Sequence, residues 1–189
     1  MALVVLLRGV NVGGHKTFRP SVMAKTLNCE AINIGAAGTF VIRKPVARMK
    51  IRADIARRLP FEAEVMICEG SEILRLVSAR PFSGQPSGPA ILQFAGVMAK
   101  RKQLRSVPLV MPPAGAWSLK IVGVHGRIVL GVCRREMNAI AYLGQLEKII
   151  GVPVTTRSWN TILAIARTLK GGSTMAPEGD NGDGSARSI

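Results

Sequence analysis

Leu3–Lys16, with the sequence LVVLLRGVNVGGHK, is the stretch that decides the fold. It opens with a short run of apolar, mostly branched residues and then breaks into a segment rich in glycine. A short apolar run that ends in glycines is typical of a buried strand that leads into a tight loop. Glycine adopts backbone conformations that are closed to other residues, so we expect a sharply turned loop. The sequence therefore predicts a buried strand followed by a candidate functional loop.

Charged and polar residues surround this loop. Arg8 and Lys16 flank it, and Asn11, Gly13 and Gly14 lie within it. The backbone N–H groups of a glycine-rich turn can surround a phosphate or a carboxylate, and the two cations would strengthen such a site. The residue orders of a Walker loop and of a dinucleotide fingerprint are both absent. A turn that needs glycine for its geometry, with Asn11 bonded to local backbone, is an equally open interpretation.

Predicted strands and helices follow one another outward from this loop as far as residue 169. The first half predicts, after the opening strand, a helix at 20–27, a hairpin at 31–42, a helix at 46–59, a strand at 63–68 and a helix at 71–79. The second half predicts a strand at 90–95, a brief basic helix or loop at 100–105, a hairpin at 117–132, a helix at 137–150, a brief strand at 155–156 and a helix at 158–169.

The order of elements repeats, because each half follows the pattern βαββαβ with one further helix. Such a unit forms an antiparallel sheet with helices packed on it, as in the ferredoxin-like fold. We therefore predict an α+β protein with two ferredoxin-like subdomains, 1–80 and 90–170, related by an internal duplication. The Pro/Gly/Ser-rich segment 81–89 is predicted to link them. The segment 171–189, rich in Gly, Ser, Asp and Asn, is predicted to be a disordered tail.

A second polar motif, TTRSWNT, spans Thr155–Thr161. A helix that begins near Ser158 would present free N–H donors to an anion, with Arg157 and Asn160 beside them. If this motif meets the glycine-rich loop in space, the polar residues of the two segments would line one site. Helix capping by Ser158, with Trp159 anchored in the core, is the alternative.

The LLRGVNVGGHK and TTRSWNT segments together resemble the bacterial family known as domain of unknown function 1697. Its members share an LLRGINVGG opening, a QSGN turn inside the first hairpin and a TTRNWNT segment before the last helix, and the resemblance covers residues 3–169. It implies a duplicated, ferredoxin-like α+β fold and brings no activity with it. The chain departs from the family at 35–39, where GAAGT lacks the amide side chains of the QSGN turn, and at Ser158, which replaces Asn but keeps a good helix cap.

The chain is strongly basic, with 26 Lys and Arg against 11 Asp and Glu and a formal net charge of +15. The excess of positive charge is spread over both halves, and the electrostatic field that it produces favours anionic partners. We expect a basic anion-binding protein, with nucleic acid as the favoured ligand and an ordinary solvated basic surface as the competing interpretation. The candidate nucleic-acid surface comprises Arg43, Lys44, Lys50, Arg52, Arg57, Arg58, Lys100, Arg101 and Lys102.

Aromatic side chains that could stack on bases are few. The predicted strands offer Phe40, Phe94 and Trp117 at most, and all three suit a core equally well. The alternatives to nucleic-acid binding are an enzyme that acts on a phosphorylated or carboxylated small molecule at the glycine-rich loop, and a protein-interaction module. No catalytic residues are assigned, and the oligomeric state is left open.

Metal and membrane functions receive no support from the sequence. The three cysteines lie far apart without a CxxC pair, and the two histidines are scattered, so we predict neither a metal site nor a cofactor. Reduced, mostly buried thiols favour a cytoplasmic location. No apolar run approaches the roughly 18 residues that a membrane span needs, so no membrane partner is expected.

Overall fold

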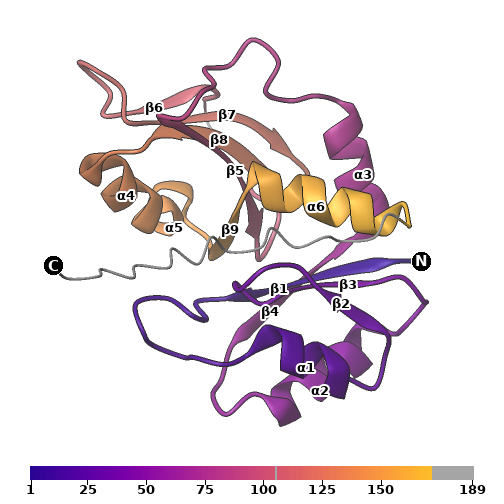
Figure 1. Cartoon of the computed structure of the whole chain (residues 1–189). Helices are drawn as coiled ribbons and strands as arrows, with labels where there is room; N and C mark the ends of the chain where they lie inside the picture. Colours follow the sequence, from indigo (N-terminus) through magenta and orange to yellow (C-terminus); the bar gives the residue numbers. More distant parts are fainter. Residues whose placement is uncertain (105, 172–189) are drawn as a thin grey trace, which may run out of the picture.

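The structure is a computed structural model that describes residues 1–104 and 106–171. It is a mixed α+β protein with two antiparallel sheets and helices packed against them (Figure 1). Apart from Gly171, the predicted disordered tail at 171–189 lies outside the described residues. Among the described helices, none is long and apolar enough to cross a membrane.

The first sheet has four strands in the order β2-β3-β1-β4. The elements of this half are β1 (Leu3–Arg8), α1 (Pro20–Thr26), β2 (Ala31–Asn33), β3 (Thr39–Ile42), α2 (Arg48–Arg58), β4 (Glu64–Glu69) and α3 (Gly70–Ser78). The predicted opening strand is confirmed as β1, which pairs antiparallel with both β3 and β4. Leu3 is 4% exposed and the next four residues are exposed by at most 1%, because both faces of this central strand are covered.

The second sheet has five strands in the order β6-β7-β8-β5-β9. The elements of this half are β5 (Ile91–Met98), β6 (Leu109–Met111), β7 (Leu119–His125), β8 (Ile128–Arg134), α4 (Met137–Gly144), α5 (Leu146–Ile150), β9 (Val154–Ser158) and α6 (Trp159–Leu169). Strand β5 lies between β8 and β9 and pairs antiparallel with both. Strands β7, β8, β5 and β9 occupy the same order as β2, β3, β1 and β4 of the first sheet.

The structure refines three predictions for the second half. Residues 100–104 form a loop, one of the two alternatives predicted there, and strand β6 stands where a helix would complete the repeated element order. The single helix predicted at 137–150 is divided at Gln145 into α4 and α5, next to a glycine that weakens a helix interior. The brief strand at 155–156 is the full strand β9.

Three apolar clusters hold the layers together. Helices α1 and α2 cover one face of the first sheet, where Met23 and Ile55 join Val5 in one cluster. Helix α5 and the start of α4 cover one face of the second sheet, where Leu146 joins Phe94 in another. The remaining faces of the two sheets turn toward each other, and α3 and α6 complete this central layer (Figure 1). The core therefore consists of two outer clusters and one shared central cluster.

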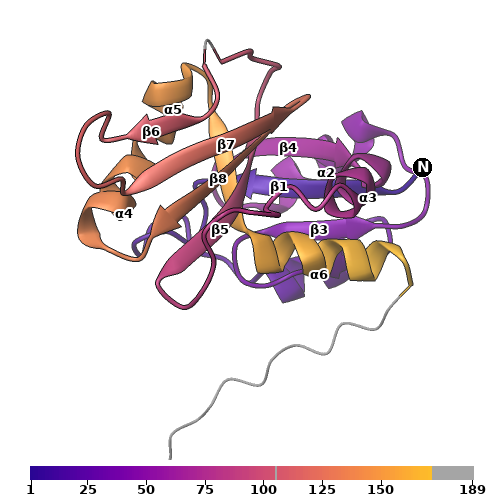
Figure 2. The ribbon, with the colours of Figure 1, turned by 90° about the horizontal axis from the view of Figure 1, so that it is seen from above.

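The central cluster draws its residues from both halves of the chain. Val4 comes from the first sheet, Leu130 from the second and Ile162 from α6. Helix α6 ends the second half but packs against α3 of the first (Figure 2). Phe82, from the predicted linker, is 8% exposed and lies edge-to-face on Trp159, with ring centroids 4.9 Å apart. The two halves thus share a core, and the start of the predicted linker is part of it.

Replacement of Gly131 by Ala tests the packing of the second sheet. A Cβ atom at this position would lie 2.3 Å from the Phe94 ring and 2.8 Å from the Lys120 carbonyl oxygen. Because the backbone cannot yield cheaply, we expect Gly131→Ala to lower the free energy of unfolding by about 3 kcal/mol. Gly144→Ala is the matched control, since nothing lies within 4 Å of its added methyl group. Urea denaturation should show the first variant destabilised and the second unchanged or slightly stabilised.

Candidate functional site

The glycine-rich loop after β1 is a tight hairpin whose backbone is largely left-handed. Positive φ angles occur at Gly9, Asn11, Gly13, Gly14 and Lys16. The main-chain N–H of Asn11 donates to the carbonyl of Lys16 at 3.1 Å, which closes the hairpin. Gly14 has nothing within 4 Å of an added Cβ, so its role is conformational and does not involve close approach of another group. Gly13 and Gly14 are both exposed at the tip of the loop.

Asn11 fixes the base of this loop to its surroundings. Its side-chain Nδ2 donates to the carbonyl oxygens of Phe18, at 3.1 Å, and Ala36, at 2.7 Å. Its Oδ1 accepts from the main-chain N–H of Phe18 at 2.9 Å. The Asn11 side chain therefore bonds backbone groups, as one of the two interpretations of the loop expects. One of those bonds crosses to the turn between β2 and β3.

Arg8, the last residue of β1, joins two carboxylates from different parts of the chain. Its Nε and Nη2 atoms donate to the two carboxylate oxygens of Glu147 in α5, each at 2.5 Å. Its Nη1 donates to Glu64 of β4 at 3.2 Å. The hydrogen bonds from Arg8 hold the pKa of Glu147 below its ordinary value, against the opposing effect of burial. The Arg8 guanidinium, about a third exposed, is thus an ionic link between the two halves.

Arg157 lies in β9 and is almost completely buried, with 8% exposure. Its Nε donates to Thr39 Oγ1 at 2.7 Å, and its Nη1 donates to Thr155 Oγ1 at 2.9 Å and to the Thr156 carbonyl at 2.7 Å. Its Nη2 donates to the carbonyls of Leu7, at 2.9 Å, and Ala37, at 2.6 Å. All five guanidinium N–H groups are therefore engaged within the protein.

No carboxylate of the described residues forms an ion pair with Arg157. Its five acceptors are hydroxyl and carbonyl oxygens, so the buried charge is stabilised by dipoles alone. Desolvation lowers the pKa of Arg157 to about 10, and the side chain stays charged at neutral pH. A buried cation with this many fixed acceptors demands an accurate arrangement of the segments that supply them.

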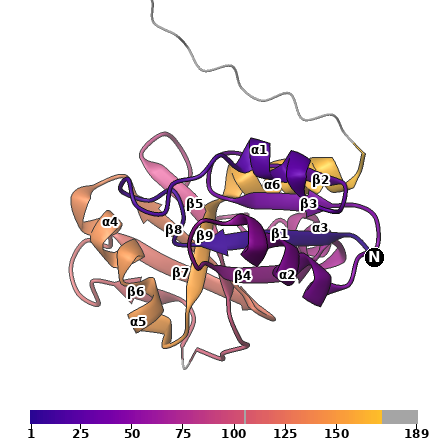
Figure 3. The ribbon, with the colours of Figure 1, turned by 90° about the horizontal axis from the view of Figure 1, so that it is seen from below.

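The two polar motifs do meet in space. Thr155 Oγ1 donates to the Leu7 carbonyl at 3.3 Å, next to the bond from Arg157, and β9 runs beside the end of β1 (Figure 3). Asn11 and Arg157 converge on the turn between β2 and β3 at two successive residues, Ala36 and Ala37. This is the turn that corresponds to QSGN in the resembling family, and here its main-chain carbonyls act as the acceptors.

Ser158 and Asn160 lie in a different setting. Ser158 Oγ accepts from the main-chain N–H of Thr161 at 3.3 Å, so the predicted helix cap is confirmed. Both residues line a hollow of about 240 Å³ together with Arg135 and Gln93. The lining of this hollow includes none of the polar residues at the end of β1. The structure thus separates the predicted polar residues into two groups.

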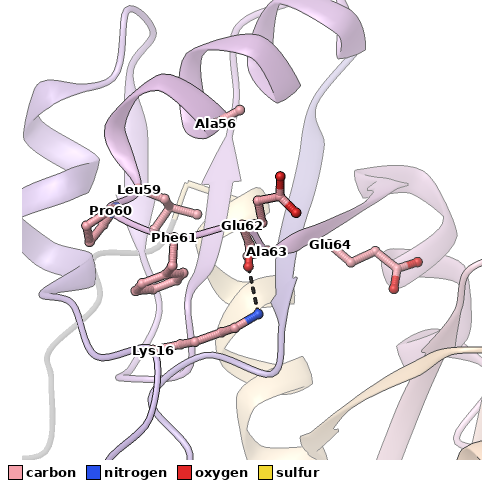
Figure 4. Close-up of a pocket in the computed structure, with 8 residues that line it drawn as sticks. All are labelled: Lys16, Ala56, Leu59, Pro60, Phe61, Glu62, Ala63 and Glu64. Atoms are coloured by element: carbon pink, nitrogen blue, oxygen red, sulfur yellow. Dashed lines mark hydrogen bonds between the residues drawn. The ribbon is translucent and has the colours of Figure 1, made fainter.

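Lys16 is the glycine-loop residue that borders a hollow of about 680 Å³. Its Nζ donates to the main-chain carbonyl of Glu62 at 2.8 Å (Figure 4). The apolar part of the lining comes from the end of α2 and the following segment, with Phe61 and Leu59 among its members. Glu64 lies at the edge of the same hollow. The depression is wide and open, and two of its charged side chains, Lys16 and Glu64, are already bonded to other protein groups.

The basic residues of the predicted nucleic-acid surface fall into two sets. Several have partners within the protein: Lys44 pairs with Glu30, Arg52 donates to the carbonyl of Val65, and Arg57 and Arg58 both pair with buried Asp54. The others are exposed and make no ion pair with any described residue: Arg43, Lys50, Lys100, Arg101 and Lys102.

The cysteines do not form an activated nucleophile. Burial raises the pKa of the thiols of Cys29, Cys68 and Cys133, that of Cys68 to about 11. A thiol with a raised pKa carries little thiolate at neutral pH. Within residues 1–104 and 106–171, no group of three or more His, Cys, Asp or Glu side chains could hold a metal ion.

Sequence reasoning missed the acceptors of both arginines. Glu64, Glu147 and Thr39 receive bonds from Arg8 or Arg157 but belong to no recognisable motif. One signal was available, because Glu147 is one of only two acidic residues between 81 and 170. Isolated acids in a basic segment are good candidates for specific ion pairs.

Substitution of Arg157 tests the link between the motifs. Arg157→Lys would leave at least two of the five buried acceptors without a donor, so we expect the free energy of unfolding to fall by about 3 kcal/mol. Arg167→Lys on the exposed face of α6 is the control and should change stability by no more than about 0.5 kcal/mol. Equal stability of the two variants in urea denaturation would contradict the role given to Arg157.

Replacement of Glu147 by Gln tests the ionic link through pH. Because the folded-state pKa of Glu147 is lowered, its carboxylate stabilises the fold above its unfolded pKa of about 4.3, and this contribution is lost as the pH falls through the lower folded pKa. We expect Glu147→Gln to lower the free energy of unfolding by about 1 kcal/mol at neutral pH, and by progressively less below about pH 4. Glu62→Gln, at an exposed position without an ion pair in the described structure, should follow the wild type in thermal melts across this range.

Comparison with known proteins finds one family model that matches the chain. No curated protein and no solved structure matches it. A model of one family, described as protein of unknown function (DUF1697), matches residues 1–107. This match includes β1, the glycine-rich loop and the turn whose carbonyls bind Asn11 and Arg157. The chain therefore belongs to the DUF1697 family, as the opening LLRGVNVGG and the TTRSWNT segment predict.

Proposed function

We propose that this protein binds nucleic acid through phosphate contacts made by its exposed basic residues. The observation that carries the proposal is the run Lys100-Arg101-Lys102, three consecutive exposed cations that make no ion pair with the described residues. Such groups are free to replace the counterions of a phosphate backbone. Arg43 and Lys50 add two further exposed cations near and on α2.

The distribution of acidic groups supports this proposal. Most carboxylates of the described chain are engaged internally, in ion pairs with arginine or lysine, in the α3 capping box through Glu72, or with Ser118 through Glu136. Carboxylates that are already bonded in this way are not available to neutralise the unpaired cations at 100–102. The positive excess of the sequence therefore remains on exposed side chains, where it can attract a polyanion.

The partnered basic residues have a smaller part in the proposal. Arg57 and Arg58 are bound to the buried carboxylate of Asp54, and Arg52 to a main-chain carbonyl. Each of these guanidinium groups already directs part of its N–H donors to a protein acceptor, so fewer donors are free for a phosphate. The proposed interface thus relies on fewer residues than the nine that the sequence suggests.

We also infer that the two halves are ferredoxin-like units that arose by duplication. The support is the shared strand order, with β7, β8, β5 and β9 corresponding to β2, β3, β1 and β4, all in antiparallel ladders. Strand β6 would then be an addition at the edge of the second unit, in place of the first helix of the repeat.

Neutralisation of the basic run tests the function. We expect Lys100→Gln/Arg101→Gln/Lys102→Gln to weaken binding of labelled DNA and to reduce the slope of log affinity against log salt by up to about 3, since each lost phosphate contact removes about 0.9 for a duplex. Fluorescence anisotropy from roughly 50 to 200 mM salt measures this slope.

A second triple variant controls for net charge alone. Lys25, Arg75 and Arg167 are exposed, lie on three different helices and make no ion pair in the part of the chain that the structure describes. Their replacement by Gln removes the same formal charge from dispersed positions. Equal losses in both triple variants would argue for a diffuse field without an interface at 100–102. The absence of binding by the wild type at low salt would overturn the proposed function.

A further inference from the structure

We propose that the nucleic acid is bound in single-stranded form and that an unpaired base stacks at Trp117. This inference rests on the proposed function and names the class of nucleic acid that it concerns. Trp117 lies just before β7 in the second sheet. The evidence comes from the burial of the aromatic residues, the cations around this indole and a polar hollow on the same sheet.

Burial separates Trp117 from the other aromatic residues that the strands could offer. Phe40 is fully buried and Phe94 is 1% exposed, so neither ring can meet a ligand. Trp159 packs edge-to-face on Phe82 in the central cluster. Trp117 is only half-buried and contacts the margin of that cluster. Trp159 is half-buried too, but its ring packs on Phe82, whereas the Trp117 ring packs on no other aromatic ring of the described residues.

Two cations lie over the Trp117 ring. Lys120 Nζ is 4.4 Å from the ring centroid and Arg134 Cζ is 4.9 Å from it. Neither forms an ion pair with any residue of the described chain, and the nearby Glu136 accepts a hydrogen bond from Ser118. A half-buried indole beside two cations without ion pairs would offer a base the exposed part of an aromatic ring, and it would offer the phosphate positive charge.

A polar hollow of about 240 Å³ is lined in part by β5 of the same sheet. Ile91 of β5 lines it and pairs with Arg134 of β8. Gln93, Arg135 and Asn160 contribute its polar groups. Amide and guanidinium groups can bond the edges of a base or its phosphate. The second sheet therefore carries a polar hollow in addition to the indole and its two cations.

Stacking at Trp117 requires an unpaired base. In a duplex both faces of each base are covered by its neighbours, so the indole cannot reach them without unstacking. Exposed cations elsewhere on the surface bind the phosphates of single strands and duplexes alike. Trp117 would therefore give the protein its preference for single strands, whereas the basic run 100–102 would supply affinity for both forms.

Anisotropy titrations with an oligothymidylate of about twelve nucleotides, and with the duplex of the same length, test this inference. We expect Trp117→Ala to weaken binding of the single strand by about 5- to 100-fold and to leave duplex binding within about twofold. Trp117→Phe keeps an aromatic face and should retain most of the single-strand affinity. The salt slope should not change in either variant, because no charge is removed.

Further measurements separate loss of stacking from loss of folding. Thermal melts followed by circular dichroism show whether Trp117→Ala is folded, and in a Trp159→Phe background the single strand should quench the fluorescence of Trp117. Binding of both nucleic acids that is indifferent to Trp117, or that falls equally for strand and duplex in a folded Trp117→Ala protein, would overturn this inference and leave the proposed function standing. Failure of the wild type to bind either nucleic acid would overturn both.

Discussion

The structure depends on one buried positive charge. The guanidinium of Arg157 is removed from water and is stabilised by five hydroxyl and carbonyl oxygens without a carboxylate. Dipoles stabilise a buried charge only when they are fixed in direction, so β1, β9 and the turn between β2 and β3 must be held in one arrangement. The contact between the two halves is therefore specific as well as apolar. The shared central cluster supplies the bulk of the burial, and Arg157 fixes how the halves are placed.

This arrangement changes the meaning of the two polar motifs. Asn11 and Arg157 each donate one hydrogen bond to a main-chain carbonyl of the same turn, and Arg8 donates to Glu64 and Glu147. Main-chain carbonyls do not depend on the side chain that carries them. The turn at residues 35–38 can therefore keep this role although it lacks the amide side chains of the QSGN sequence.

Charge is divided between the interior and the surface in a way that suits a polyanion ligand. Glu147 neutralises Arg8 across the two halves, and Asp54 neutralises Arg57 and Arg58 within α2. The cations that remain without partners, such as those at 100–102, are exposed. The few acidic residues of the protein are thus mostly bonded to its own side chains, and the unpaired positive charge lies on exposed residues. Trp117, with Lys120 and Arg134 over its ring, adds an aromatic group on the second sheet.

Local sequence determined the buried strand β1, the hairpins, the cap at Ser158 and the family, because each depends on residues close together in the chain. Tertiary structure alone decided that Arg157 bonds the Leu7 carbonyl, 150 residues away in sequence, and that Arg8 pairs with Glu147. It also decided that Phe94 is fully buried and Trp117 only half-buried, although both are aromatic residues on or beside strands. These outcomes depend on which sheet faces are covered and by which helices, and no local pattern carries that information.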